Sequence, residues 1–494
     1  MSTKNRLPRW QLWPLVLALA CSPLAAQLPT LGEGGDMTVS AERKLGERIA
    51  RELYRDPDFI EDPVLDEYVL GIWTKLLAGA RARGELGPEI DERFAWDVLL
   101  GKDRTINAFA LPGGWMGLHL GLLSATVNRN ELASVLAHEL SHVTQRHISR
   151  MMTEQNKQMP VLLGAMILGA IAAGRSTDAA QAAIVGGQAL TMQNQLNFSR
   201  DMEREADRVG FGVATQAGFD PQGFVGMFEK LQQASRLNDS GAYPYLRTHP
   251  MTSERIADMQ SRIPLARAAT PVPDMVHLLM AGRAKVLSDP GVDVLRGFLN
   301  EEGLQQGSPA RQAGALYAAA LASAKLRDTN GAMALTRRLA QVTSGDPEAT
   351  RQTTLLAAEI ALQSGDPTRA AALADSDRRP ELVLSSQARI RSGRAPEASE
   401  RLQTWVALHP KDSAAWELLS QAYTAQGQTL RAIRADAEAQ VAHLDYQAAM
   451  DRFKAAQDLA RKAGPGARDH IEASIIDARA RQVGSLLREQ ALER

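Results

Sequence analysis

The sequence predicts a mainly α-helical protein, in which an α+β domain with a small sheet is followed by an α-helical solenoid. Residues 27–265 mix helical apolar periodicity with one strand-like region, which is typical of such a first domain. Residues 266–494 are rich in Ala, Leu, Arg and Gln and predict one helix after another, separated by glycine and proline. A chain of 494 residues is also long enough for two or three domains.

The amino terminus is typical of an export signal. Basic residues come first, an apolar run over residues 10–20 follows, and small residues over 24–26 supply a cleavage site before Gln27. The apolar run is shorter than the roughly 20 residues of a membrane span, and an uncleaved anchor is the alternative. We therefore expect residues 1–26 to be a signal peptide that directs export of the mature protein.

Composition narrows the classes of function and of metal site. The chain is 45% hydrophobic and 23% charged with a net charge of -1, so no positive field favours nucleic acid. Cys21 is the only cysteine and lies in the predicted signal. The mature chain can then form neither a disulfide nor a thiolate metal site, so any metal must be bound by histidines and carboxylates.

The segment after Asn128 predicts a helix that carries a His-Glu-x-x-His motif. Asn128 can cap this helix, and Glu131 can reach back to its start as in a capping box. Because His138 and His142 are four residues apart, their imidazoles project from one helix face and can share one zinc ion. Glu139 is rotated by about 100° and can serve as general base toward the attacking water. A polar pair on a solvated helix face is the alternative.

A hydrolytic zinc site needs a third protein ligand, and a later acidic segment offers candidates. Glu203 and Asp207 are four residues apart and share a helix face. One of them can bind the metal, while the other accepts a hydrogen bond from a ligand imidazole. Spacing alone does not choose between Glu203 and Glu205, and a solvated face with internal ion pairs is the alternative for the whole segment.

The two motifs together resemble those of the M48 peptidases. The second motif of that family is Glu-x-x-x-Asp, and its glutamate is the third zinc ligand. The resemblance therefore selects His138, His142 and Glu203 as metal ligands, with Asp207 as the residue that orients a ligand. It implies a zincin-like metallopeptidase fold, one zinc ion per subunit, and peptide-bond hydrolysis with Glu139 as the catalytic base.

Two further segments resemble motifs of the same family. Asn107, Ala108 and Phe109 are similar to the strand beside the cleft, which can pair with an extended substrate. The Thr-His-Pro segment around His249, followed by Arg255, resembles another motif. In one subgroup this histidine can take the fourth zinc position and hold the enzyme off, so His249 is a candidate regulatory ligand. An ordinary loop histidine is the alternative, and Arg255 is a candidate oxyanion contact.

Helix boundaries recur along the carboxy-terminal half. Ser-Gly-Asp-Pro stands at 344–347 and again at 364–367. Gly393, Pro410 and Gly427 are further residues at which a helix is expected to end. Their spacing is close to one short helix plus a turn, and two such helices approach the roughly 34-residue tetratricopeptide period. Tetratricopeptide solenoids bind partners in a concave groove, which predicts a binding role for this half. A generic helical bundle is the alternative.

The apolar segment over residues 159–190 lies between the two metal motifs. Its apolar stretch, over residues 159–174, is short for a membrane span. Two interpretations stay open, namely a buried element packed over the cleft and a mobile element that makes peripheral contact with a membrane or a partner.

Signal, peptidase motifs and repeats together resemble the M48 subgroup that acts in outer-membrane β-barrel assembly. The resemblance implies a location in the periplasm and misfolded or assembling outer-membrane proteins as clients. It also implies the β-barrel assembly machinery as a partner through the repeats, and a chaperone-like role beside proteolysis. The alternative is mainly an adaptor or chaperone in which proteolysis is rarely used. The chain departs from the subgroup in lacking the cysteines of its repeat-domain disulfide.

Overall fold

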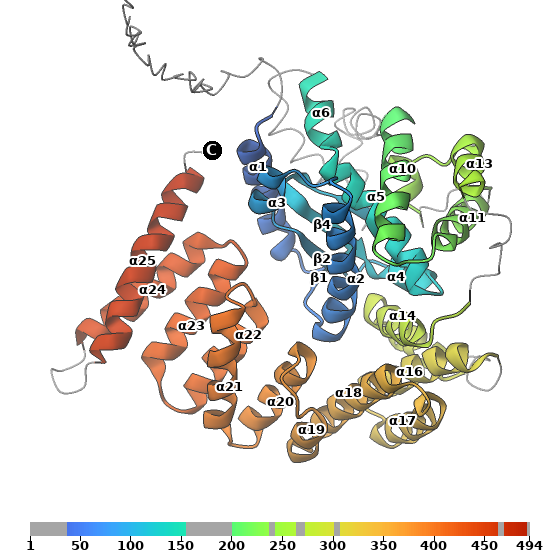
Figure 1. The fold of residues 1–494 in the computed structure, drawn as a ribbon. Helices are drawn as coiled ribbons and strands as arrows, with labels where there is room; N and C mark the ends of the chain where they lie inside the picture. Colours follow the sequence, from blue (N-terminus) through green and yellow to red (C-terminus); the bar gives the residue numbers. More distant parts are fainter. Residues whose placement is uncertain are drawn as a thin grey trace, which may run out of the picture. The chain divides into compact units, whose positions relative to one another are not determined.

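The computed structural model describes six stretches of the chain, whose elements are drawn in Figure 1. These stretches are residues 37–154, 200–236, 243–262, 272–300, 307–462 and 469–491. The predicted signal peptide over residues 1–26, the predicted domain boundary at 265–266 and the apolar segment over 159–190 lie outside them. These three hypotheses stay predictions.

A four-stranded sheet forms the predicted α+β part. Its strands are β1 (Phe59–Ile60), β2 (Asp97–Gly101), β3 (Ala108–Ala110) and β4 (Trp115–His119), in the order β1-β2-β4-β3. β2 and β4 are parallel, whereas β1 and β3 run antiparallel to the strands beside them. β3 is therefore an edge strand, and one of its sides pairs with no other strand of this sheet.

Helices make up most of the amino-terminal part around this sheet. Within the described stretches, no helix is both long enough and apolar enough to cross a membrane. The helices, with the 3-10 turn η1, are α1 (Val39–Tyr54), α2 (Pro63–Ala82), α3 (Pro88–Arg93), η1 (Pro112–Gly114), α4 (Leu120–Ala125), α5 (Arg129–Thr144), α6 (His147–Glu154), α10 (Arg200–Gln216), α11 (Gln222–Arg236), α12 (Tyr245–Thr248) and α13 (Ser253–Ser261).

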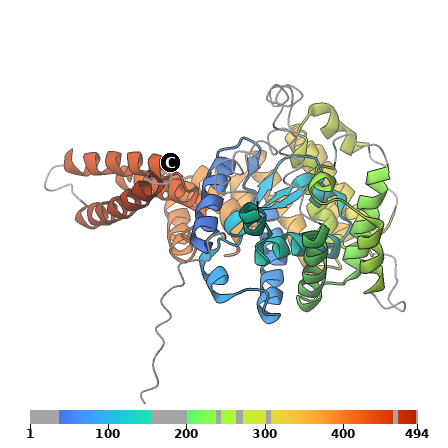
Figure 2. The ribbon, with the colours of Figure 1, turned by 90° about the horizontal axis from the view of Figure 1, so that it is seen from above.

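The carboxy-terminal part is a series of helices in which neighbours in sequence pack against each other. Figure 2 shows the last two, in red, lying side by side. This confirms the predicted mainly α fold with a small sheet and a helical solenoid. The helices are α14 (Met275–Ser288), α15 (Val292–Leu299), α16 (Pro309–Lys325), α17 (Thr329–Thr343), α18 (Pro347–Gln363), α19 (Pro367–Leu373), α20 (Arg379–Arg391), α21 (Ala395–Leu408), α22 (Ser413–Ala425), α23 (Thr429–Ala442), α24 (Tyr446–Lys462) and α25 (His470–Ala491).

The repeated Ser-Gly-Asp-Pro segments start helices, as their sequence predicts. Asp346 caps α18 and Asp366 caps α19, and Pro347 and Pro367 are the first helical residues. After α22, Gly427 has a φ of 71°, a left-handed conformation that glycine adopts without strain. Local sequence chemistry thus sets the helix boundaries of this part.

The start of α2 holds the carboxy-terminal helices in place. Asp62 caps α2 by accepting a hydrogen bond from the backbone N–H of Leu65 at 3.0 Å. Both carboxylate oxygens of Asp62 also accept hydrogen bonds from Arg283 of α14, at 2.7 and 2.8 Å. Arg283 pairs in addition with Glu359 of α18 at 2.7 Å. Removing one partner of a buried ion pair costs about 3–5 kcal/mol, so this contact fixes α14 and α18 against α2.

Two more arginines repeat this arrangement on the next turn of α2. Arg351 of α18 pairs with Glu67 at 2.7 Å, and Arg379 of α20 pairs with Asp66 at 2.8 Å. The apolar core also runs without a break from α2 through α14, α16 and α18 to α20. The parts on either side of the predicted boundary therefore share one core in the described structure.

His277 of α14 is buried and bonded on both ring nitrogens. Nδ1 lies 2.7 Å from the Tyr68 hydroxyl and Nε2 lies 2.9 Å from the Thr126 hydroxyl. The Thr126 hydroxyl donates to the carbonyl of Leu123 at 3.0 Å and so accepts from Nε2–H. Tyr68 then donates to Nδ1, which is an arrangement for a neutral ring. Burial lowers the pKa of His277 to about 4.

We predict that His277 makes the free energy of unfolding depend on pH. The unfolded chain takes up the proton near pH 6.5 and the folded protein near pH 4, so the unfolded state binds more protons in between. Roughly 3 kcal/mol of stability is therefore lost as the pH falls through this window. Urea unfolding at pH 7 and pH 4 should show a smaller loss in His277→Leu than in the wild type. Equal losses would contradict the assignment.

Candidate metal centre

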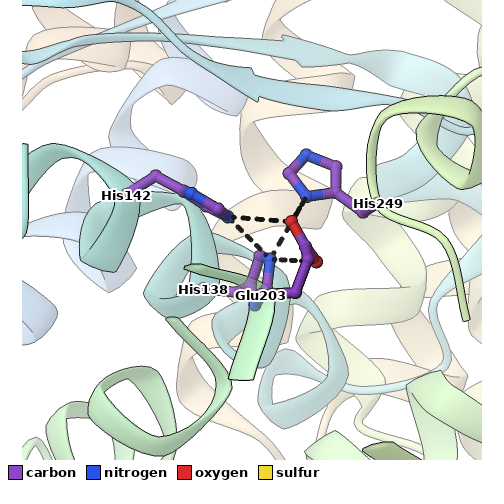
Figure 3. Close-up of side chains that lie close together, drawn as sticks. All are labelled: His138, His142, Glu203 and His249. Atoms are coloured by element: carbon purple, nitrogen blue, oxygen red, sulfur yellow. Dashed lines mark hydrogen bonds and ion pairs between the residues drawn. The ribbon is translucent and has the colours of Figure 1, made fainter. Parts of the chain in front are cut away.

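Four side chains converge at a buried point beside the sheet. His138, His142, Glu203 and His249 each offer one ligand atom, and these atoms lie within 4.8 Å of one another. Figure 3 shows the three imidazoles and the carboxylate turned toward a common centre. Each residue is at most 2% exposed. The structure therefore brings together the predicted metal ligands and the predicted regulatory histidine.

Helix α5 supplies the two histidines of the first motif. Asn128 caps the helix by accepting from the backbone N–H groups of Asn130 and Glu131, as predicted. The carboxylate of Glu131 reaches back to the N–H of Val127 at 2.8 Å. Every residue from Glu131 to Thr144 is buried. The alternative of a solvated helix face is therefore wrong for this segment.

Helix α10 supplies Glu203 and packs closely on α5. At their crossing stands Gly210, where a Cβ atom would lie 3.0 Å from the carbonyl oxygen of Ala137 and 3.1 Å from the nitrogen of His138. The absence of a side chain lets the two helix backbones approach at the level of the motif. This approach puts Glu203 Oε1 within 3.5 Å of His142 Nε2.

Asp207 lies behind His138, one turn along α10 from Glu203. Its Oδ1 is 2.9 Å from His138 Nδ1, and Arg255 of α13 pairs with both of its oxygens at 2.7 and 2.8 Å. Arg255 also pairs with Oε2 of Glu203 at 2.7 Å. Burial alone would raise the pKa of Asp207, but His138 and Arg255 hold it below its usual value. Asp207 is thus a charged acceptor that fixes the orientation of the His138 ring.

The electrostatics of the centre favour a cation. Burial lowers the pKa of His142 well below its usual value. Burial acts in the same direction on His138, but hydrogen bonds to Asp207 and Glu203 raise its pKa to about 10. The carboxylates therefore hold a positive charge at the centre, and a metal ion can provide that charge in place of a proton.

Glu139 lies beside the four converging side chains. Its Oε2 accepts a hydrogen bond from the backbone N–H of Ala110 in β3 at 2.9 Å. Its Oε1 accepts no hydrogen bond from the described residues and lies 3.5 Å from His249 Nε2. Burial raises the pKa of Glu139. The carboxylate is therefore held by one oxygen while the other faces the centre.

The predicted substrate strand is the edge strand nearest to Glu139. Ala108 and Phe109 belong to β3, and Asn107 precedes it and accepts a hydrogen bond from the N–H of His119 at 3.1 Å. This segment is held to β4 on one side only.

His249 follows α12 and reaches the centre from a separate segment. Its N–H donates to the carbonyl of Tyr245 at 2.9 Å, and the two rings stack with centroids 4.5 Å apart. Its Nδ1 lies 2.9 Å from Oε1 of Glu203 and 3.3 Å from Nε2 of His138. The ring is 1% exposed, so it is not an ordinary loop histidine.

One residue of the centre was missed by the sequence analysis. His147 opens α6, is fully buried, and lies with its Nδ1 2.9 Å from Nδ1 of His142. Its Nε2 lies 3.0 Å from Glu205, which also pairs with Arg150 at 2.8 Å. Glu203 and Glu205, which spacing could not separate, therefore have different surroundings. The signal was a histidine five residues after His142, but a turn between two helices hides that proximity.

Comparison with known families agrees with this geometry. Residues 88–263 match the profile of peptidase family M48. The matched region contains the sheet from β2 onward, α5, α10 and all four converging side chains. This region is therefore a domain of peptidase family M48, and the chain is a metallopeptidase.

Relatives with described activities are similar over different lengths. The chain is 35% identical over 286 residues to the putative beta-barrel assembly-enhancing protease of Vibrio cholerae, and the alignment covers 56% of each chain. It is 29% identical over 429 residues to the beta-barrel assembly-enhancing protease of Escherichia coli K12, covering 85% of each chain. It is 28% identical over 195 residues to the mitochondrial metalloendopeptidase OMA1 of Arabidopsis thaliana, covering 40% of this chain and 36% of that one.

Gly210 gives a direct test of the helix approach. A valine at this position meets the α5 backbone, so we expect Gly210→Val to cost about 1–3 kcal/mol of stability and to weaken metal binding. Gly71 of α2 is the matched control, because a Cβ atom there meets nothing within 4 Å. Thermal unfolding and zinc titration of Gly210→Val and Gly71→Val check this. Equal stability and equal zinc binding in the two variants would show that the close approach of α10 to α5 is not needed.

Proposed function

We propose that this chain is an exported zinc metalloendopeptidase that acts in quality control and assembly of outer-membrane β-barrel proteins. The observation that carries the peptidase part is the buried convergence of His138, His142 and Glu203, with Glu139 beside them. The proposed organisation is a signal peptide over residues 1–26, a peptidase domain over 27–265 and a tetratricopeptide-like domain over 266–494.

The donor set fits zinc. Three imidazole nitrogens and one carboxylate oxygen are ligands that zinc prefers in proteins. Bonds of 2.0–2.1 Å in a tetrahedron place ligand atoms about 3.3 Å apart. The separations here are 3.0 Å between the Nε2 atoms of His138 and His142, 3.3 Å from His138 to His249, and 2.9 Å from His249 to Glu203. A zinc ion supplies Lewis acidity, which makes water nucleophilic near neutral pH and polarises a carbonyl.

Glu139 is the proposed catalytic base. Oε1 takes a proton from the attacking water and delivers it to the leaving amine. The N–H of Ala110 keeps Oε2 in place during both steps. Asn107, Ala108 and Phe109 offer the edge of β3 to an extended substrate, which would lie beside the base. This pairing selects peptides in an unfolded or extended conformation.

Arg255 is proposed to position ligands. Its Nε and Nη2 donate to Asp207, and its Nη1 lies at hydrogen-bonding distance from Glu203 and from the carbonyl of Pro250. A role as oxyanion contact would require one of these buried contacts to open. We therefore assign Arg255 to the support of Glu203 and Asp207.

His249 is proposed to hold the centre closed at rest. A hydrolytic zinc site keeps one position open for water, and a fourth protein ligand fills it. His249 Nε2 also stands 3.5 Å from Oε1 of Glu139, the oxygen that the Ala110 N–H does not bind. Displacement of this one ring would therefore free both the open position and the base.

The proposed client class rests on the relatives and on the carboxy-terminal helices. The similar proteins of Vibrio cholerae and Escherichia coli are named as beta-barrel assembly-enhancing proteases. A solenoid of helices can bind an assembling outer-membrane protein or the β-barrel assembly machinery, which gives a chaperone-like role beside proteolysis. The second candidate function is an adaptor or chaperone with proteolysis rarely used, and the closed position of His249 favours it.

Replacement of Glu139 tests the peptidase function. Glu139→Gln should keep all zinc ligands and lose the base, so zinc content stays at the wild-type level while casein cleavage falls by about 10²–10⁴-fold. Glu254→Gln, on an exposed turn of α13, is the matched control and should cleave normally. Casein cleavage by Glu139→Gln at the wild-type rate would exclude Glu139 as the base.

The same variant separates the two candidate functions in cells. Full support of outer-membrane protein assembly by Glu139→Gln would favour the adaptor role, whereas its loss would favour the protease role.

Removal of His249 tests the closed state. His249→Ala leaves three protein ligands and frees Oε1 of Glu139, so basal casein cleavage should rise about tenfold if closure is worth roughly 1.4 kcal/mol. His409→Ala, which removes a ring stacked on Trp405, is the control and should leave cleavage unchanged. Unchanged or lower cleavage by His249→Ala would contradict the closed state.

A further inference from the structure

Each of the two motif histidines contacts a further residue through its second ring nitrogen. For His138 that residue is Asp207, at 2.9 Å. For His142 it is His147, at 2.9 Å between the Nδ1 atoms, with the two rings edge to face. Both rings of this second pair are fully buried. The first contact follows from the family motif, whereas the second has no counterpart in the motifs discussed above.

Proton placement in the second pair has one consistent solution. A hydrogen bond between two nitrogens needs one donor and one acceptor. His142 turns its Nε2 toward the other ligand atoms, so a metal ligand there needs the Nε2 lone pair and leaves the proton on Nδ1. His142 therefore donates from Nδ1, and His147 accepts at its own Nδ1. The proton of neutral His147 is then on Nε2.

Glu205 completes this chain of hydrogen bonds. Its Oε2 lies 3.0 Å from Nε2 of His147, and an ionised carboxylate can only accept. Arg150 holds the same oxygen at 2.8 Å from the solvent side. His147 protonated at Nδ1 would point a second N–H at that of His142. The chain from Arg150 through Glu205 and His147 thus favours one tautomer for His142, in which the lone pair of Nε2 faces the other ligand atoms.

The backbone brings His147 back onto the ligand helix. Arg146 has a φ of 54°, a left-handed conformation that is uncommon for a residue with a side chain. It lies between α5 and α6, so His147 folds back toward His142 instead of continuing the helix. The guanidinium of Arg146 pairs with the buried carboxylate of Glu42 at 2.9 Å, which holds the turn.

We propose that His147, supported by Glu205, is a positioning residue that fixes the tautomer and ring orientation of the metal ligand His142. This inference rests on the proposed zinc site. Each motif histidine then has its own supporting residue. Asp207 supports His138, and neutral His147 with Glu205 supports His142. Such residues behind a ligand typically change metal affinity by about 10–100-fold.

Zinc affinity of the full chain, measured by competition with a chromophoric chelator, tests this role. We expect His147→Leu to bind zinc about 10–100-fold more weakly than the wild type. His147→Asn keeps an acceptor near the position of Nδ1 and should recover most of that affinity. Glu205→Leu removes the outer acceptor and should weaken binding about tenfold, near the lower end of the same range.

His277→Leu is the matched control for a loss of stability alone. His277 is also a fully buried histidine with two hydrogen bonds, but its partners are Tyr68 and Thr126. Urea unfolding of the metal-free proteins gives the stability of each variant. His277→Leu should lose stability and keep wild-type zinc affinity, whereas His147→Leu should lose zinc affinity beyond any loss of stability.

The outcomes separate this inference from the proposed function. Failure of the wild-type chain to bind zinc more tightly than His138→Ala would overturn the zinc site itself. Tight binding by the wild type with equal affinity in His147→Leu would overturn only the role of His147, as would a loss no greater than that of His277→Leu. Should His147→Leu not fold, Glu205→Leu decides, and wild-type affinity in it overturns the inference.

Discussion

The contact of Asp207 with both His138 and Arg255 is the interaction on which the rest of the centre depends. It ties together α5, α10 and α13, because the histidine, the aspartate and the arginine come from these three helices. Arg255 extends the tie to Glu203. A charge buried this deeply is stable only when it is paired. Loss of any one member leaves an unpaired buried charge, which costs several kcal/mol of folding stability. The proposed ligand atoms are therefore held in place by contacts within the protein.

This constraint explains why α5 is buried on every side. Helix α5 carries two imidazoles and a carboxylate into the interior of the protein. Such a helix needs charged partners on the side that bears these groups and close packing on its other sides. Gly210 lets α10 approach far enough for Glu203 and Asp207 to reach their partners. An amphipathic pattern cannot reveal such a helix, because it has no solvated face. The cap at Asn128 and the spacing of the histidines can reveal it, and the cap was predicted correctly.

Local spacing was sufficient for the pairs that lie on one helix. The geometry of an α-helix places Glu203 and Asp207 on one face of α10, and both reach the centre. It cannot say which residues two helices bring together, so the partnership of Arg255 with Asp207 could not be derived. His147 was hidden for another reason, since its approach to His142 depends on the left-handed conformation of Arg146, which side-chain pattern does not encode. The family resemblance supplied what spacing left open, notably the choice of Glu203 over Glu205.

Helix α2 links the metal centre to the carboxy-terminal helices. Its first turns carry the carboxylates that bind Arg283 and Arg379. Near its other end Gly79 lies against α10, where a Cβ atom would be 2.7 Å from the carbonyl oxygen of Val213. At 1.5 Å per residue, Gly79 lies about 20 Å from Asp66 and about 25 Å from Asp62 along the helix axis. The carboxy-terminal helices and α10, which carries Glu203, thus pack against the same helix.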